Sequence, residues 1–380
     1  MDALIRAALR AASGVLGAVV AEPVVVGSSS RSVVLRCSAG AGAGSAIVKA
    51  FRDDPEGRRS FTSEAAGLSL GLAGPELLGV DAAASVVVME DVGTGLSLAD
   101  ALVGGDCRLA GHGLRAWARE LGRLAALSLP RRAEFDRRCA EYDKGVAWWG
   151  SEPWIERNGE EFLAVLDAVH VAAPAGLAAE LGHLTAAEHR FPALTPGDSC
   201  PYNALLAPNG VRLIDFEGAG FQSVFLTAAY CRSPFPSCWC VCRIPDAVAA
   251  AAERTYRAEV AAVYPELGEE AVWEAGMRWA TAVWTVDATA YWLPRVVAGD
   301  GPLHPRQPTG PTRRQVLRYR WERAEAALAG GDFRAVGETA GVLLRRIGEG
   351  WAVPPLPLYP AFAGAPRRAA IVASAAHSQR

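Results

Sequence analysis

Residues 194–220, LTPGDSCPYNALLAPNGVRLIDFEGAG, contain three polar side chains whose spacing decides how the rest of the chain is interpreted. Asp198 is followed five positions later by Asn203, and Asp215 comes twelve positions after that. Two apolar runs, ALLAP and VRLID, flank an Asn-Gly pair, which is typical of a two-residue type I′ hairpin turn. The spacing therefore predicts a loop followed by a short hairpin.

This hairpin should bring the polar residues together at its open end. With Pro208 opposite Val211, Ala204 would lie opposite Asp215, so Asn203 would sit beside Asp215. Carboxylate and amide oxygens suit Mg²⁺, and Asp198 on the preceding loop could orient a hydroxyl and accept its proton. The alternative is a capping Asp, a turn Asn and an Asp that ends a strand. A phosphate-binding element elsewhere in the chain would favour the first interpretation.

Length and charge exclude several classes of protein. A chain of 380 residues can bury a large core and form two lobes. The net charge of −3 and pI near 6.1 give no basic footprint for nucleic acid. No apolar run reaches the roughly 18 residues that span a bilayer, and the N-terminal segment is expected to be an amphipathic helix that leads into a strand. We therefore expect a cytoplasmic protein without a nucleic-acid or membrane partner.

Four of the eight cysteines lie in residues 231–242, CRSPFPSCWCVC. Their Cys-x-Cys-x-Cys spacing differs from the Cys-x₂-Cys pairs of zinc sites. Alternation along a strand would place Cys238, Cys240 and Cys242 on one buried face. We expect free buried thiols here rather than a metal site, as suits a reducing compartment.

The N-terminal part of the chain reads as a sheet. Residues 24–51 predict three strands, and the loop between the first two contains Ser29 and Ser30. Backbone N–H groups and hydroxyls of this loop could cover phosphates, although a plain hairpin loop fits equally well. Lys49, near the end of the third strand, is one of only two lysines among 38 basic residues. That scarcity singles out its place in an apolar strand.

A helix and two more strands should complete this lobe. Apolar residues recur at helical spacing over residues 61–72, and Glu64 lies within this helix. The runs PELLGVD and SVVVMEDV predict two further strands, making five. The second run turns polar at a segment that includes Met89, Glu90 and Val92, whose backbone groups could pair with an adenine edge. Helical patterns then continue to about residue 347.

Taken in order, these motifs resemble the aminoglycoside phosphotransferase and choline-kinase-like branch of the protein-kinase-like fold. The resemblance covers roughly residues 15–235, and that family's loop typically reads H-G-D-x-x-x-x-N followed by I-D-[FW]-E. It implies an α+β fold with two lobes. Residues 1–92 would form the nucleotide-binding lobe, residues 93–350 the helical C-terminal lobe and residues 351–380 a Pro/Ala-rich tail.

The resemblance also implies a reaction, the transfer of a phosphoryl group from ATP with Mg²⁺ to a hydroxyl. Asp198 would be the catalytic residue, and Asn203 and Asp215 the metal ligands. The implied nucleotide-binding residues are Lys49, Glu64, Ser29, Ser30, Met89, Glu90 and Val92.

Two departures from the family pattern leave an alternative open. Pro196 stands where the family usually has His. After IDFEGAG the family continues G-D-P-x-x-D-L-A, whereas this chain has FQSVFLTAA, with Ser223 and Thr227 near the places of the two aspartates. The chain could therefore be a pseudokinase, a nucleotide-binding or partner module without turnover.

The acceptor is open as well. The resemblance implies a small-molecule hydroxyl, on an aminoglycoside-like antibiotic or other natural product, a sugar or an amino alcohol, in antibiotic resistance or biosynthesis. Residues 151–190 hold seven acids against two arginines, which would attract a cationic substrate but also fit a solvated helix face. Trp148, Trp149 and Trp154 could line a cleft, with core packing as the default. Residues 306–346 hold nine arginines against four acids, which keeps a peptide Ser/Thr substrate open.

Overall fold

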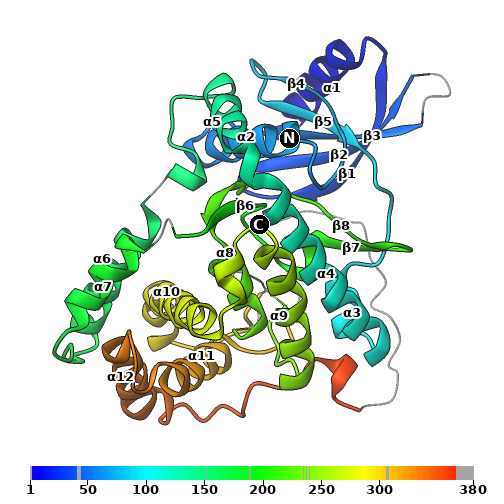
Figure 1. Cartoon of the computed structure of the whole chain (residues 1–380). Helices are drawn as coiled ribbons and strands as arrows, with labels where there is room; N and C mark the ends of the chain where they lie inside the picture. Colours follow the sequence, from blue (N-terminus) through cyan, green and yellow to red (C-terminus); the bar gives the residue numbers. More distant parts are fainter. Residues whose placement is uncertain are drawn as a thin grey trace.

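The computed structural model describes residues 2–40, 44–151, 153–187, 190–233, 235–236, 238, 240–304 and 308–364. A five-stranded antiparallel sheet with two helices forms one lobe, and a larger, mainly helical lobe follows it in the chain (Figure 1). The expected two-lobed α+β fold is confirmed.

The sheet has the order β1-β2-β3-β5-β4, and each neighbouring pair is antiparallel. Its strands are β1 (Val20–Ser28), β2 (Ser32–Ala39), β3 (Ser45–Phe51), β4 (Leu77–Asp81) and β5 (Val86–Glu90). All five strands were expected from the sequence, as was the N-terminal helix α1 (Asp2–Leu16).

Strand alternation decides what each face of the sheet buries. Val48 and Ala50 belong to the small core that α1 covers, together with Val86 and Val88 of β5. Because successive side chains in a strand point to opposite faces, Lys49 projects to the other face, toward the large core and the second lobe. The Lys49 side chain is thus the one charged group that the apolar strand β3 places on the side of the second lobe.

Helix α2 (Pro55–Ser69) lies on that second side. The Asp54 carboxylate caps its first turn by accepting the Gly57 N–H at 2.8 Å, and Pro55 opens the helix with a preset φ. Every residue from Ser60 to Leu68 is buried, and Glu64 among them is only 1% exposed.

The second lobe is built from ten α-helices among the described residues. They are α3 (Leu98–Val103), α4 (Cys107–Ser128), α5 (Arg132–Glu141), α6 (Trp154–Ala168), α7 (Leu177–Ala186), α8 (Val224–Ala228), α9 (Asp246–Ala261), α10 (Glu270–Val297), α11 (Arg313–Leu328) and α12 (Arg334–Leu343). Short turns are η1 (Leu129–Arg131), η2 (Trp149–Ser151), η3 (Pro201–Asn203), η4 (Ala229–Cys231), η5 (Pro265–Gly268), η6 (Leu344–Gly348) and η7 (Pro360–Phe362).

Helix α4 is the central support of this lobe, packed against α9 (Figure 1). Leu114, Trp117, Leu121 and Leu124 are buried as expected, but Leu127 is 44% exposed. Ser128 is buried instead. Residues three or four apart share one face of a helix, and in this helix the buried face continues at position 128 and not at 127.

Two small sheets contact helix α4 of the second lobe. Strands β6 (Pro192–Thr195) and β9 (Gly220–Ser223) pair with each other, and β7 (Ala204–Ala207) pairs with β8 (Gly210–Leu213). The first pair was missed, since its four-residue strands are far apart in the chain and carry little pattern of their own.

The hairpin was predicted, but its register was wrong. Ala207 pairs with Gly210 and Ala204 with Leu213, so the turn is Pro208-Asn209 and Asp215 lies beyond the strand. Proline fits the second position of such a turn because its φ is preset, and Asn209 does not adopt the positive φ that a type I′ turn requires.

Of the tail expected over residues 351–380, the structure describes residues 351–364. Trp351, Leu356 and Tyr359 are buried against the large core. In the described parts of the chain, no helix combines the length and apolarity needed to cross a membrane.

Two glycines of α4 test how tightly it packs. A Cβ on Gly122 would lie 3.0 Å from the Tyr256 carbonyl oxygen and 2.7 Å from the Glu259 Cβ on α9. We expect Gly122→Ala to lower the free energy of unfolding by about 1–3 kcal/mol through overpacking. A Cβ on Gly111 meets nothing within 4 Å, so Gly111→Ala should raise it by up to about 1 kcal/mol. Urea denaturation measures both, and equal effects would contradict the packing described.

Candidate active site

Lys49 stands at the centre of a buried ionic cluster. Its Nζ donates to Glu64 Oε2 at 2.6 Å, so β3 and α2 are joined by a buried ion pair. It also donates to Asp215 Oδ1 and lies 3.3 Å from Glu217 Oε2. One cation thus faces three carboxylates from α2 and from the segment after β8.

Burial and charge oppose each other in this cluster. Burial on its own would lower the pKa of Lys49, but the attraction of Asp215, Glu64 and Glu217 outweighs it and raises the pKa, so the ammonium stays charged. For Glu64, burial is the larger effect and raises the pKa, against the opposing attraction of Lys49. Three carboxylates thus surround one ammonium, and the Arg31 guanidinium supplies a second positive charge beside Glu217.

Carboxylate oxygens of Glu64, Asp215 and Glu217 all lie within 4.8 Å of one another. Such hard oxygen donors match Mg²⁺. Asp215 adopts a left-handed backbone with φ 67°, and its side chain is 35% exposed, so it is the member most open to solvent. Glu217 was not among the residues singled out from the sequence, although it belongs to the IDFE motif.

Arg31 ties the Ser-rich loop to this cluster through an ion pair with Glu217. Ser29 Oγ accepts the N–H groups of Arg31 and Ser32, both at 3.1 Å, so its hydroxyl shapes the loop. Ser30 is exposed. Arg31 was not expected, and its position in the loop that could cover phosphates is the signal that could have revealed it.

The loop with Asp198 and Asn203 is held close to the segment after Asp215. The Asn203 side-chain amide donates to the Asp198 carbonyl oxygen at 3.2 Å, and Ile214 N–H donates to the Asn203 carbonyl oxygen at 2.9 Å. The Asp198 carboxylate accepts the Cys200 N–H at 3.1 Å. Despite the shifted hairpin register, Asp198, Asn203 and Asp215 therefore occupy one region.

Backbone contacts support this loop where the family would have a histidine. Gly197 has φ 94°, and a Cβ there would lie 2.3 Å from the Gly218 carbonyl oxygen, so the loop and the segment after Asp215 touch backbone to backbone. Trp117 Nε1 on α4 donates to the Ser199 carbonyl oxygen at 3.2 Å. These contacts fix the loop in the presence of Pro196.

The two residues near the places of the family's aspartates differ in their surroundings. The Ser223 hydroxyl is buried and has no hydrogen-bond partner among the described residues. Thr227 is buried, and the Tyr256 hydroxyl on α9 donates at 3.1 Å to the carbonyl oxygen of Val224, which starts the same helix as Thr227. Both belong to the β9–α8 junction.

Hydrogen bonds and ion pairs hold the polar turn after β5 in place. Met89 is buried and pairs with Ile47 and Leu77, while the Glu90 N–H already donates to the Glu76 carbonyl oxygen at 2.9 Å. That N–H would have to give up this bond to reach an adenine edge. Val92 is half-buried.

Asp91, between those residues, was not singled out. It accepts two hydrogen bonds from Arg36, at 2.6 and 2.9 Å, one from Ser45 Oγ at 2.6 Å and one from Gly93 N–H at 2.9 Å. The hydrogen bonds from Arg36 are the largest cause that lowers the pKa of Asp91 to about 2. This carboxylate fixes the turn to β2 and β3.

Two of the tryptophans serve packing. Trp149 Nε1 donates to Ser60 Oγ on α2 at 3.2 Å, and its ring lies under the Arg59 guanidinium. Trp154 packs on Trp284 with ring centroids 5.6 Å apart. In the basic stretch, three arginines are paired with nearby acids, as Arg318–Glu322, Arg334–Glu338 and Arg345–Glu325.

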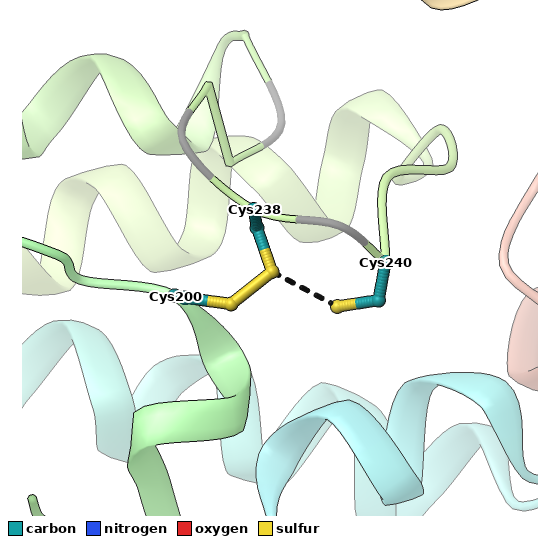
Figure 2. A group of neighbouring side chains, drawn as sticks. All are labelled: Cys200, Cys238 and Cys240. Atoms are coloured by element: carbon teal, nitrogen blue, oxygen red, sulfur yellow. Dashed lines mark hydrogen bonds between the residues drawn. A yellow bond between two sulfur atoms is a disulfide. The ribbon is translucent and has the colours of Figure 1, made fainter. Parts of the chain in front are cut away.

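The cysteine expectation needs correction. Cys238 is not free but forms a disulfide with Cys200 of the Asp198–Asn203 loop, and Cys240 Sγ lies 3.2 Å from Cys238 Sγ (Figure 2). The described residues from 238 to 242 form no strand, so the alternation argument does not apply. All of these cysteines are buried, as expected. Sequence spacing could not reveal Cys200 because it is 38 residues away from Cys238.

No family model and no curated protein matches the chain. Among solved structures, it is similar to a choline/ethanolamine kinase family protein from Mesorhizobium loti, with 15% identity over 85% of this chain and 93% of that one, at a TM-score of 0.46. It is also similar to a putative fructosamine-3-kinase from Thermobifida fusca, with 18% identity over 75% of this chain and 92% of that one, at 0.43.

A third similar structure is the aminoglycoside phosphotransferase APH(4)-Ia in complex with ADP and hygromycin B. The identity is 13% over 85% of this chain and 99% of that one, at a TM-score of 0.45. With TM-scores below 0.5, these likenesses carry no conclusion by themselves, and the function has to be argued from the side chains of the site.

Asp91 generates a stability prediction with a defined sign. Because its folded pKa, about 2, is below the ordinary value of 3.8, its contribution is present above about pH 4 and is lost as pH falls toward 2. We expect Asp91→Asn to lower the free energy of unfolding at pH 7 by about 2 kcal/mol. The difference in the free energy of unfolding between Asp91→Asn and wild type should be smaller when urea denaturation is measured at pH 3.

The matched control is Asp53→Asn. The Asp53 side chain is 82% exposed and pairs with Arg58 at the surface, so its loss should leave stability unchanged within error. Equal losses in the two variants, or a loss in Asp91→Asn that grows at low pH, would contradict the assignment.

Proposed function

We propose that this protein is an ATP- and Mg²⁺-dependent phosphotransferase of the aminoglycoside phosphotransferase and choline-kinase-like family, acting on a hydroxyl of a small molecule. The observation that carries the proposal is the bonding of Lys49. It joins the sheet, Glu64 of α2 and Asp215, next to the loop with Asp198 and Asn203. This bonding supports the proposal because protein kinases use a strand lysine paired with a helix glutamate, together with an Asp that holds metal.

Each residue would have one role. Lys49, oriented by Glu64, would bind phosphate oxygens, and Asn203 and Asp215 would hold Mg²⁺. The Asp198 carboxylate would orient the acceptor hydroxyl and take its proton. ATP with Mg²⁺ supplies the phosphoryl group. In the structure Lys49 is bonded to Asp215 and lies 3.3 Å from Glu217, so it would have to release Asp215 in order to bind phosphate oxygens.

The nucleotide would lie along the inner side of the residue 1–92 lobe, with Ser29, Ser30 and Arg31 above the phosphates and Met89, Glu90 and Val92 near the base. The acceptor would enter from the residue 93–350 lobe. The acidic excess of residues 151–190 supports a cationic acceptor, such as an aminoglycoside-like antibiotic, another natural product or an amino alcohol. A protein of this kind would work in the ATP-rich cytoplasm.

Nucleotide binding is tested by thermal unfolding with a non-hydrolysable ATP analogue, with and without Mg²⁺. At a hundredfold excess over its dissociation constant, a ligand of the native state adds about 2.7 kcal/mol of stability. We expect a Mg²⁺-dependent shift in wild type and in the surface control Asp53→Asn, and its loss in Asp215→Asn. No shift in wild type with either ATP or GTP analogues would refute the proposal.

Turnover separates an enzyme from a pseudokinase. We expect ADP release with at least one member of a panel of aminoglycosides, choline-like alcohols and sugars. Asp198→Asn should lower kcat by several orders of magnitude and leave the nucleotide-dependent thermal shift intact. Nucleotide binding without turnover on this panel, but with transfer to Ser/Thr peptides, would identify a peptide kinase. Binding without any transfer would identify a binding module.

A further inference from the structure

A second cluster of side chains of the metal-ligating type joins the proposed catalytic loop to a segment that follows it in the chain. Cys200 comes from that loop, between Asp198 and Asn203, and Cys238 and Cys240 come from the segment after η4 (Figure 2). Their three Sγ atoms lie within 4.8 Å of one another. The residues are only 3%, 5% and 1% exposed, so the cluster is enclosed by protein.

We propose that, once the Cys200–Cys238 disulfide is reduced, these three sulfurs bind a thiophilic d¹⁰ metal ion, Zn²⁺ or Cu⁺. Tetrahedral zinc with Zn–S bonds of about 2.3 Å holds its sulfurs about 3.8 Å apart. The Sγ atoms of Cys200 and Cys238, now 2.03 Å apart, and those of Cys238 and Cys240, 3.2 Å apart, would therefore have to separate once the disulfide is reduced. Thiolates select these ions over the hard Mg²⁺ of the carboxylate cluster.

The disulfide and the metal would exclude each other. A dithiol reductant breaks the Cys200–Cys238 S–S bond, becomes a disulfide itself and leaves one proton on each of the two cysteine sulfurs. The metal ion then replaces the protons of three thiols and releases them to solvent. Either state links the same two segments of the chain, which are 38 residues apart.

Cys242 is buried two residues beyond Cys240, but its sulfur is not among the three that lie within 4.8 Å of one another. Three thiolates suffice for Cu⁺, whereas zinc would need a fourth ligand, from Cys242 after a local shift or from water. The Tyr359 hydroxyl donates to the Cys240 carbonyl oxygen, and Arg243 N–H donates to the Pro357 carbonyl oxygen at 2.8 Å. The metal would thus tie the proposed catalytic loop to the chain near its C-terminal end.

The test is direct measurement of metal in the full-length protein purified anaerobically with a phosphine reductant. We expect about one equivalent of zinc or copper per chain by mass spectrometry, and thiolate-to-metal charge-transfer bands after substitution with Co²⁺. Cys240→Ser should lose the metal and the bands at least tenfold. Cys139→Ser, which removes a buried thiol of α5 outside the cluster, should keep both.

Folding is controlled by circular dichroism and by a second variant, Cys238→Ala, which should also lose the metal while remaining folded. Oxidation of wild type with diamide should release the metal and yield a peptide pair linked through Cys200 and Cys238. Reduced, folded wild type without bound metal and without cobalt–thiolate bands would overturn the proposal. So would full metal retention in Cys240→Ser. Because the readout is metal content, the result stands apart from any outcome on nucleotide binding.

Discussion

The buried ammonium of Lys49 is the constraint on which the rest of the structure depends. A single charge at 4% exposure is costly unless it is paired, and removing one member of such a pair typically costs about 3–5 kcal/mol. Here the pairing partners come from α2 and from the segment after β8. The requirement to satisfy one lysine therefore holds the sheet, the helix behind it and the loop of the second lobe in a fixed relation.

A second constraint is the close approach of two glycine-containing segments. Gly197 and Gly218 leave no room for a Cβ between the loop of Asp198 and the segment after Asp215. Trp117 on α4 donates a hydrogen bond to the same loop, and a disulfide links Cys200 of the loop to Cys238. The loop is thus held by packing and by a covalent bond on several sides.

Together these constraints explain why the polar residues converge although the hairpin is offset by two residues from its predicted register. Ile214 still bonds to Asn203, and this single backbone hydrogen bond brings Asp215 next to the loop. The Asp91 and Arg36 pair then fixes the turn that leads from the sheet into the second lobe. The convergence depends on these contacts rather than on the turn type.

From the sequence alone, the five strands, the helix with Glu64 and the order Lys49, Asp198, Asn203, Asp215 could be predicted, because period-2 and helical patterns are local and the motif spacing is short. The hairpin register could not, since Pro208 and Asn209 compete for the turn. The roles of Arg31, Glu217 and Asp91, the β6–β9 pair and the grouping of Cys200 with Cys238 and Cys240 were decided only by the tertiary structure. Each depends on contacts between segments far apart in the chain, and a charge or a thiol carries no sign of its partner in the local sequence.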